Sequence, residues 1–86
     1  MNKKQELLTI TMEECGELIQ ACSKLIRFEE DSCPDDLSNL QDEIGDLICM
    51  IELIKQEGLV NEEKIRERME VKKEKLKKWS NLFNEV

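Results

Sequence analysis

Two short acidic phrases of the sequence repeat each other: EECGELI at residues 13–19 and DEIGDLI at residues 42–48. Their acidic, glycine and aliphatic positions match one by one, 29 residues apart. Each phrase places one carboxylate three residues before another, and residues at that spacing share one face of a helix. Carboxylate oxygens are the ligands that Mg²⁺ and Mn²⁺ prefer in proteins. The repeat therefore predicts that two antiparallel helices each supply half of one cation site.

Angular position separates the acids within each phrase. At about 100° per residue, Glu14 falls inside the apolar arc of its helix, Glu17 lies at the margin of the arc, and Glu13 points to the polar side. Glu43 and Asp46 repeat the first two positions on the second helix. Most acidic residues of a helix lie on a solvated face, but an ionised carboxylate in an apolar seam is costly unless it is neutralised. A bound cation or a proton is therefore expected there.

Helical periodicity and helix breakers divide the chain into three segments. Apolar residues at helical spacing predict three helices and a short tail, over residues 3–28, 34–57, 61–79 and 80–86. Pro34 suits the first turn of the second helix, Gly58 suits its end, and Asn61 can cap the third helix. Charged residues make up 38% of the sequence and aromatic residues 3%, which is typical of exposed or paired helices. We therefore expect one all-α domain spanning residues 1–86.

The short chain and its charge bear on partners and location. A domain of 86 residues leaves much apolar surface in contact with water, so a homo-oligomer is predicted, with the third helix outside. The net charge of -7 opposes general attraction to nucleic acids or anionic membranes. No apolar run reaches the roughly 18 residues of a membrane span, and the N-terminus lacks the apolar stretch of a signal peptide. A cytoplasmic location without nucleic-acid or membrane partners is expected.

The cysteines do not indicate a metal or disulfide framework. Cys15, Cys22, Cys33 and Cys49 form no CxxC pair, and the sequence contains no histidine. Reduced thiols are therefore predicted. Because Cys15 and Cys22 are seven residues apart on one side of a helix, both are expected to be small core residues.

The third predicted helix is strongly basic. Eight of its residues between positions 64 and 78 are Lys or Arg and three are Glu. Most of these side chains should be solvated. Lys72, however, projects among apolar residues, and Arg68 and Lys75 flank it. These cations either contact the metal site or bound phosphates, or they cover apolar surface with their stems.

The acidic phrases carry a family resemblance over about residues 5–79. The chain resembles the MazG-like nucleotide pyrophosphohydrolases of the all-α NTP pyrophosphatase superfamily, whose motif is ExxE, a spacer, and ExxD. Here the motif reads Glu14-Cys-Gly-Glu17 and Glu43-Ile-Gly-Asp46, with 25 residues between the two halves. The preceding Glu13 extends the first half to EExxE.

The resemblance implies a fold, an activity and a site. It implies dimers or tetramers whose helices form a four-helix bundle. It also implies Mg²⁺-dependent hydrolysis of a nucleoside triphosphate between the α and β phosphates, releasing a monophosphate and pyrophosphate, with Mn²⁺ able to substitute. The implied catalytic acids and metal ligands are Glu14, Glu17, Glu43 and Asp46. The family also places cations of a later helix around the phosphates, and although its K-x-x-N element has no clear match here, the candidates are Arg68, Lys72 and Lys75.

Two alternatives stay open at this point. The first is a non-enzymatic helical dimerisation or adaptor module whose acids pair with the basic third helix, so that metal does not affect folding and no nucleotide is consumed. The second keeps the superfamily but takes a phosphoribosyl-linked nucleotide as substrate. Base and sugar preference are not fixed, because the aromatic residues able to stack on a base are equally suited to packing: Phe28, Trp79 and Phe83.

Overall fold

The computed structural model describes residues 1–27 and 34–84, and within these ranges it contains three helices and no strand. The helices are α1 (Lys3–Arg27), α2 (Pro34–Gln56) and α3 (Glu62–Trp79). The all-α prediction is therefore confirmed. The observed helix ends in these ranges agree with the predicted ones to within one residue. The predicted end of the first helix at Phe28, and Cys33, lie outside the described residues.

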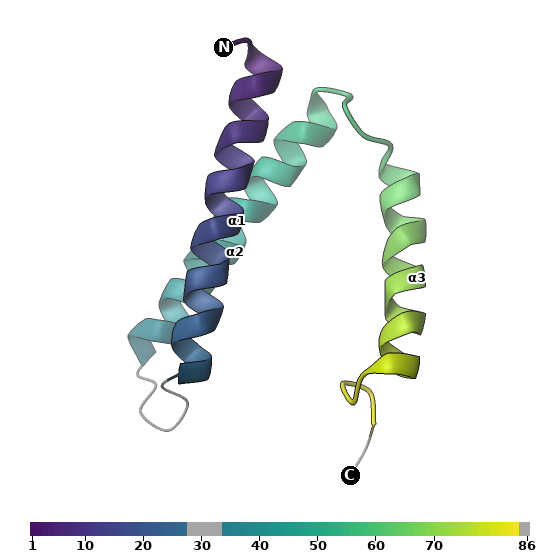
Figure 1. The fold of residues 1–86 in the computed structure, drawn as a ribbon. Coiled ribbons are helices and arrows are strands. Elements are labelled where there is room, and N and C mark those ends of the chain that lie inside the picture. Colours follow the sequence, from purple (N-terminus) through teal and green to yellow (C-terminus); the bar gives the residue numbers. More distant parts are fainter. Residues whose placement is uncertain (28–33, 85–86) are drawn as a thin grey trace.

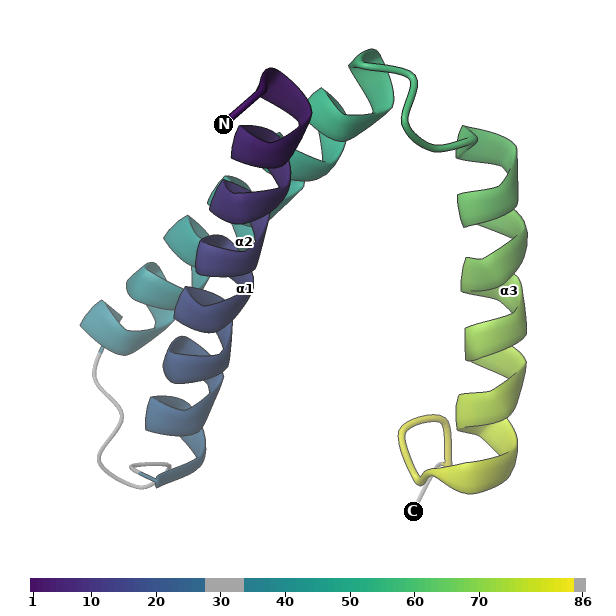
Figure 2. The same cartoon turned by 45° about the horizontal axis from the view of Figure 1, so that its top comes forward.

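α1 and α2 pack along one another as an antiparallel pair (Figure 1). α3 stands apart from the pair, and Figure 2 shows the same separation from another direction. Within the described ranges, α1 with α2 is the one pair of helices that packs over an extended surface. The third helix thus lies outside, as expected, but it is not packed against the other two. No helix of the described residues is long and apolar enough to cross a membrane.

Each helix of the pair turns one heptad stripe toward the other. Positions spaced alternately by four and three residues are typical of paired helices. On α1 these positions are all buried or half-buried: Leu7, Thr11, Glu14, Leu18, Ala21 and Leu25. On α2 the equivalent positions are also covered: Asp36, Leu40, Glu43, Leu47, Met50 and Ile54. We call these two facing stripes the inner seam.

A second heptad stripe lies one residue further along each helix and is exposed. On α1 it consists of Leu8, Met12, Cys15, Ile19, Cys22 and Ile26. On α2 its apolar members are Leu37, Ile44, Ile48 and Ile51. One residue advances a helix by about 100°, so two helices that share the inner seam leave this second stripe uncovered. We call the second pair of stripes the outer seam.

The cysteines fall on the outside of the helix pair. Cys15, Cys22 and Cys49 are exposed and free. The prediction that Cys15 and Cys22 are core residues is therefore wrong for this chain. The physical reason is that both belong to the outer seam, which no helix of the described residues covers.

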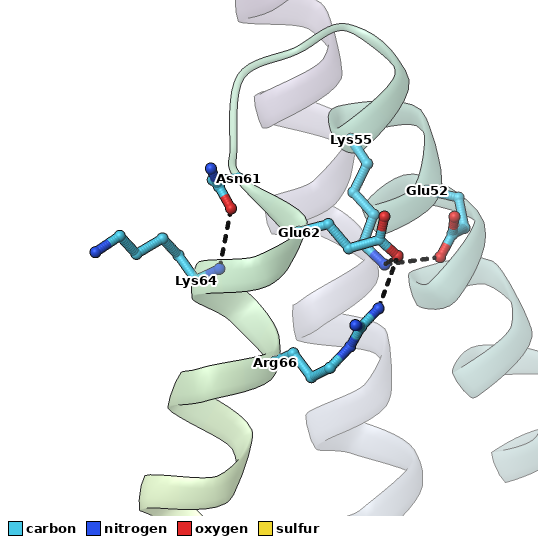
Figure 3. A network of polar contacts seen from close by, with 6 residues as sticks. All are labelled: Glu52, Lys55, Asn61, Glu62, Lys64 and Arg66. Atoms are coloured by element: carbon cyan, nitrogen blue, oxygen red, sulfur yellow. Dashed lines mark hydrogen bonds and ion pairs between the residues drawn. The ribbon is translucent and has the colours of Figure 1, made fainter.

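The helix ends follow from local side-chain chemistry. At the start of α1, the Asn2 side chain accepts a hydrogen bond from the Gln5 backbone N–H at 2.8 Å. The Gln5 side chain accepts one from the Asn2 N–H at 2.9 Å, which completes a capping box. Gly58 follows α2 with φ +72°, a left-handed conformation that favours glycine. The Asn61 side chain accepts from the Lys64 N–H at 3.0 Å, so the predicted cap of α3 is confirmed (Figure 3).

A small ionic network joins the end of α2 to the start of α3 (Figure 3). Lys55 Nζ lies 3.1 Å from a Glu52 oxygen and 3.7 Å from a Glu62 oxygen. Arg66 lies 3.9 Å from the same Glu62 oxygen. Exposed ion pairs of this kind stabilise a structure by about 1 kcal/mol or less. The network orients the first turn of α3, whereas the rest of that helix has no buried residue to hold it against the pair.

The inner seam should dominate the stability of the chain. Met50 is 8% exposed and Met69 is 63% exposed. We expect Met50→Ala to lower the free energy of unfolding by about 2–5 kcal/mol, because it removes buried apolar contacts and leaves a cavity. Met69→Ala makes the same chemical change on the surface and should alter it by about 0.5 kcal/mol or less. Urea denaturation followed by circular dichroism measures both variants, and equal losses would contradict the assignment of the core.

Candidate functional site

Three carboxylates from the two paired helices meet at the inner seam. Glu14 of α1 and Glu43 and Asp46 of α2 each offer one oxygen, and these oxygens lie within 4.8 Å of one another. Glu14 and Glu43 are half-buried and Asp46 is exposed. Ligands on opposite sides of a hard cation, each at about 2.0–2.6 Å from it, are themselves about 4–5 Å apart. The spacing of the three oxygens is therefore compatible with one shared divalent cation.

The repeat of the acidic phrase explains why these residues meet. Each phrase puts its first seam acid, Glu14 or Glu43, on the stripe that faces the other helix. The oxygens that Glu14 and Glu43 offer lie within 4.8 Å of each other, so the antiparallel pairing of α1 and α2 brings both acids to one level of the pair. Among residues 1–27 and 34–84, this is the one group of three acidic or cysteine side chains with ligand atoms so close together.

Glu43 carries the clearest sign of an unsatisfied site. Its Oε2 atom is buried and has no hydrogen-bond partner among the described residues. Buried polar atoms normally have a partner, and an ionised carboxylate oxygen without one is especially unfavourable. A cation or a proton at this oxygen would remove the penalty. The orphaned oxygen thus points to a ligand of positive charge.

Burial and neighbouring negative charge raise the pKa of both half-buried acids. The pKa of Glu43 is raised first by burial and then by the charges of Glu17, Asp46, Glu14 and Asp42. The pKa of Glu14 is also raised first by burial and then by the charges of Asp46, Glu17 and Glu13. Positive charge supplied by a metal ion reverses this effect and favours the ionised form.

Glu17 lies at the edge of the cluster. It is exposed and does not belong to the group of three oxygens, but its charge raises the pKa of both Glu14 and Glu43. A step of three residues turns a helix by about 300°, which is about 60° backward. Glu17 and Asp46 therefore lie on the side of the helix pair away from the outer seam. Three of the four predicted ligands are brought together, and the fourth borders them on this open side.

The basic candidates of α3 are not brought to the acids. Arg68, Lys72 and Lys75 are all exposed, and α3 stands apart from the pair that carries the cluster (Figure 1). Lys75 instead lines a shallow groove of about 560 Å³ along α3, together with Val71 and Trp79. The apolar stripe of α3 is thin and contains no buried residue, which explains why it does not pack on the pair within one chain.

Comparison with protein-family models agrees with the acidic motif. The MazG nucleotide pyrophosphohydrolase domain matches residues 2–80, a span that includes both acidic phrases and all three helices. No significant match was found among curated proteins or among solved structures. The matched span is nearly the whole chain, and it contains the three carboxylates that meet at the inner seam. The chain therefore belongs to the MazG nucleotide pyrophosphohydrolase family.

Proposed function

We propose that the chain is a Mg²⁺-dependent nucleoside triphosphate pyrophosphohydrolase. It would cleave a (deoxy)nucleoside triphosphate between the α and β phosphates and release a monophosphate and pyrophosphate. The observation that carries the proposal is the convergence of Glu14, Glu43 and Asp46 in a chain of the MazG family.

The donor set fits a hard divalent cation. Its ligands are all carboxylate oxygens, which suit Mg²⁺ or Mn²⁺, and the orphaned Glu43 oxygen lacks a protein partner among the described residues. We propose that Glu14, Glu17, Glu43 and Asp46 hold the metal, with Mn²⁺ able to replace Mg²⁺. A metal ion held by these residues would neutralise charge on the phosphate oxygens and make the attacking water more acidic.

The carboxylates have a second role as proton acceptors. Attack of water on phosphorus requires that a proton leave the water, and a nearby carboxylate can accept it. Burial and then the negative charges of neighbouring acids raise the pKa of Glu14 and of Glu43, so protonation of one acid depends on the charge of the others. The proton-accepting role therefore belongs to the coupled cluster rather than to one assigned residue. Exposure of Glu17 and Asp46 leaves the cluster open to substrate on one side.

The phosphates also need cations from the protein. We propose that Arg68, Lys72 and Lys75 contact them, because Lys and Arg are the side chains that bind phosphate oxygens most strongly. Since α3 stands apart from the acids in one chain, we further propose a homodimer or homotetramer in which an α3 reaches an acidic cluster and the long helices form a four-helix bundle. The core is thin, because the buried apolar side chains of the described residues are Leu7, Ala21 and Met50, and this supports such an assembly.

Pyrophosphate release from a panel of nucleotides tests the proposed reaction. We expect release from one or more (deoxy)nucleoside triphosphates with Mg²⁺, loss of release with EDTA, and recovery with Mn²⁺. A phosphoribosyl-linked nucleotide belongs in the same panel, because preference for it would keep the metal site and change the substrate. Absence of turnover with every nucleotide, in a folded protein supplied with Mg²⁺, would favour the non-enzymatic adaptor.

Glu43 should be essential for turnover. Glu43→Gln keeps the size of the side chain and one carbonyl oxygen but removes the charge that holds a hard cation. We expect turnover at saturating Mg²⁺ to fall by about 100-fold or more, while circular dichroism shows that the helices remain. Glu13→Gln is the matched control, because Glu13 is exposed and outside the group of three oxygens, and it should keep most of the activity. Similar losses in both variants would show that charge in general, and not this site, controls the rate.

Stability without metal should depend on pH in a defined direction. The folded pKa of Glu14 and of Glu43 lies above the ordinary value of 4.5, so the folded chain binds protons more readily than the unfolded chain. Their favourable contribution is therefore complete below about pH 4.5 and is lost as pH rises through the raised values. We expect urea midpoints in EDTA to fall over this range more steeply for the wild type than for Glu43→Gln. Mg²⁺ should reduce the difference between the two proteins in the slope of urea midpoint against pH. Identical slopes in EDTA would contradict the claim that the raised pKa of Glu43 affects stability.

A further inference from the structure

A third heptad stripe lies on the open side of the helix pair, where Glu17 and Asp46 border the acidic cluster. Seven residues return a helix to within about 20° of the same direction, so the residues one heptad from Glu17 and Asp46 share their side of the pair. We call the resulting set the open stripe. It consists of Ile10, Glu17 and Lys24 on α1 and Asn39, Asp46 and Leu53 on α2.

One end of the open stripe carries hydrogen-bond donors. Because α1 and α2 are antiparallel, a step of seven residues forward from Glu17 and a step of seven residues back from Asp46 lead toward the same end of the pair (Figure 1). These steps reach Lys24, which is exposed, and Asn39, which is half-buried. We call these two residues the donor end.

The side chains of the donor end are available to a ligand. Neither Lys24 nor Asn39 forms a side-chain hydrogen bond or an ion pair with any residue that the structure describes. Lys24 lies about 10.5 Å along α1 from Glu17. Side chains of a helix lean toward its N-terminus, so the long stem of Lys24 can carry its Nζ atom back toward the acidic cluster.

Carboxylates are missing from the helix segments between the cluster and the donor end. α1 contains no Asp or Glu from Leu18 to Arg27, and α2 contains none from Leu37 to Gln41. Asp35 and Asp36 come in the first turn of α2, where the positive end of that helix favours them. Negative charge at the cluster is therefore followed, in this direction, by amide and ammonium groups.

The other end of the open stripe is aliphatic. One heptad back from Glu17 is Ile10, which is half-buried, and one heptad on from Asp46 is Leu53, which is 39% exposed. Pockets for small ligands combine such apolar side chains with a few polar groups that fix the orientation of the ligand. We call these two residues the apolar end.

The order of groups along the open stripe matches the order of groups in a nucleoside triphosphate. The β and γ phosphates are anionic and accept hydrogen bonds, which suits an ammonium and an amide. The α phosphorus is the atom attacked in the proposed reaction, which suits the acidic cluster. The nucleoside presents the flat faces of its base, which suit aliphatic side chains.

We propose that the open stripe orients the substrate, with the β and γ phosphates at the donor end and the nucleoside at the apolar end. The proposal rests on the proposed function and deepens it by assigning a direction to the substrate along the helix pair. Lys24 and Asn39 then hold the two phosphates that leave as pyrophosphate. Because Lys24 belongs to α1, it supplies a cation from the same chain as the cluster, although α3 stands apart.

Binding of inorganic pyrophosphate tests the donor end directly. Isothermal titration calorimetry with Mg²⁺ present gives the Kd of pyrophosphate for each variant, and circular dichroism checks that the helices remain. We expect Lys24→Gln to raise this Kd about tenfold at low ionic strength, because a hydrogen bond between two charged groups is lost. Lys24→Arg keeps the charge and should keep most of the affinity.

Lys4→Gln is the matched control. Lys4 is also an exposed lysine of α1, but it lies about 160° from Lys24 around the helix. The substitution removes the same charge, so it should leave the Kd of pyrophosphate nearly unchanged. An equal rise in both variants would overturn the donor end, because it would show general attraction and not contact.

Binding of nucleoside monophosphates tests the direction of the substrate. AMP, CMP, GMP, UMP and dTMP are titrated in turn, and the one that binds the wild type most tightly is used for the variants. Leu53→Ala should raise its Kd about fivefold, because apolar contact is lost, and Lys24→Gln should not change it. Loss of monophosphate binding in Lys24→Gln, with pyrophosphate binding kept, would overturn the proposal by showing the opposite direction.

The reaction and the orientation fail separately. Turnover of a nucleoside triphosphate, combined with a pyrophosphate Kd that Lys24→Gln does not change, would overturn the orientation and leave the reaction standing. Absence of turnover with every nucleotide would overturn the reaction, whereas weaker pyrophosphate binding by Lys24→Gln alone would still support the donor end.

Discussion

Negative charge placed inside an apolar seam is the constraint on which the rest of this structure depends. Glu14 and Glu43 occupy positions that an ordinary helix pair fills with aliphatic side chains. Burial and mutual repulsion raise their pKa values, and one Glu43 oxygen is left without a partner among the described residues. The two acids therefore make the packing at the centre of the helix pair less stable than aliphatic side chains would. With a cation bound as proposed, this local cost would be offset by a binding site at the same acids.

A second constraint is the small number of helices. Two packed helices each bury one stripe of side chains against the other, and in this pair that stripe is the inner seam. The outer seam and α3 remain uncovered, which leaves Leu7, Ala21 and Met50 as the buried apolar residues of the described chain. The inner seam, which holds the core and the two half-buried acids, and the exposed outer seam thus occupy different sides of the same two helices. Each side is defined by its rotation about the helix axis.

The helix ends and the meeting of the two central acids could be predicted from the sequence, because both depend on the type and spacing of nearby residues. Pro34, Gly58 and Asn61 act through their own backbone or side chains, so the helix ends near them were predictable to within one residue. The meeting of Glu14 with Glu43 was predictable because the phrase and its position in the apolar arc are both repeated. Helical periodicity identifies the apolar arc of α1, but it does not show which part of the arc α2 covers. The prediction that Cys15 and Cys22 are core residues was therefore wrong. The residues of α3 predict that it is a helix, but they do not predict where the helix lies, because its position depends on contacts with other parts of the structure.

The central acids also select one alignment of the helix pair. The inner seam repeats every seven residues, so apolar contacts alone would allow α2 to slip along α1 by one heptad. Such a slip would place Glu43 beside Leu7 or Ala21, two of the buried apolar residues, and would separate it from Glu14. A carboxylate there would have no second carboxylate with which to share a cation. The acidic layer thus specifies register, as a single polar layer does in coiled coils, and a bound cation would strengthen that choice.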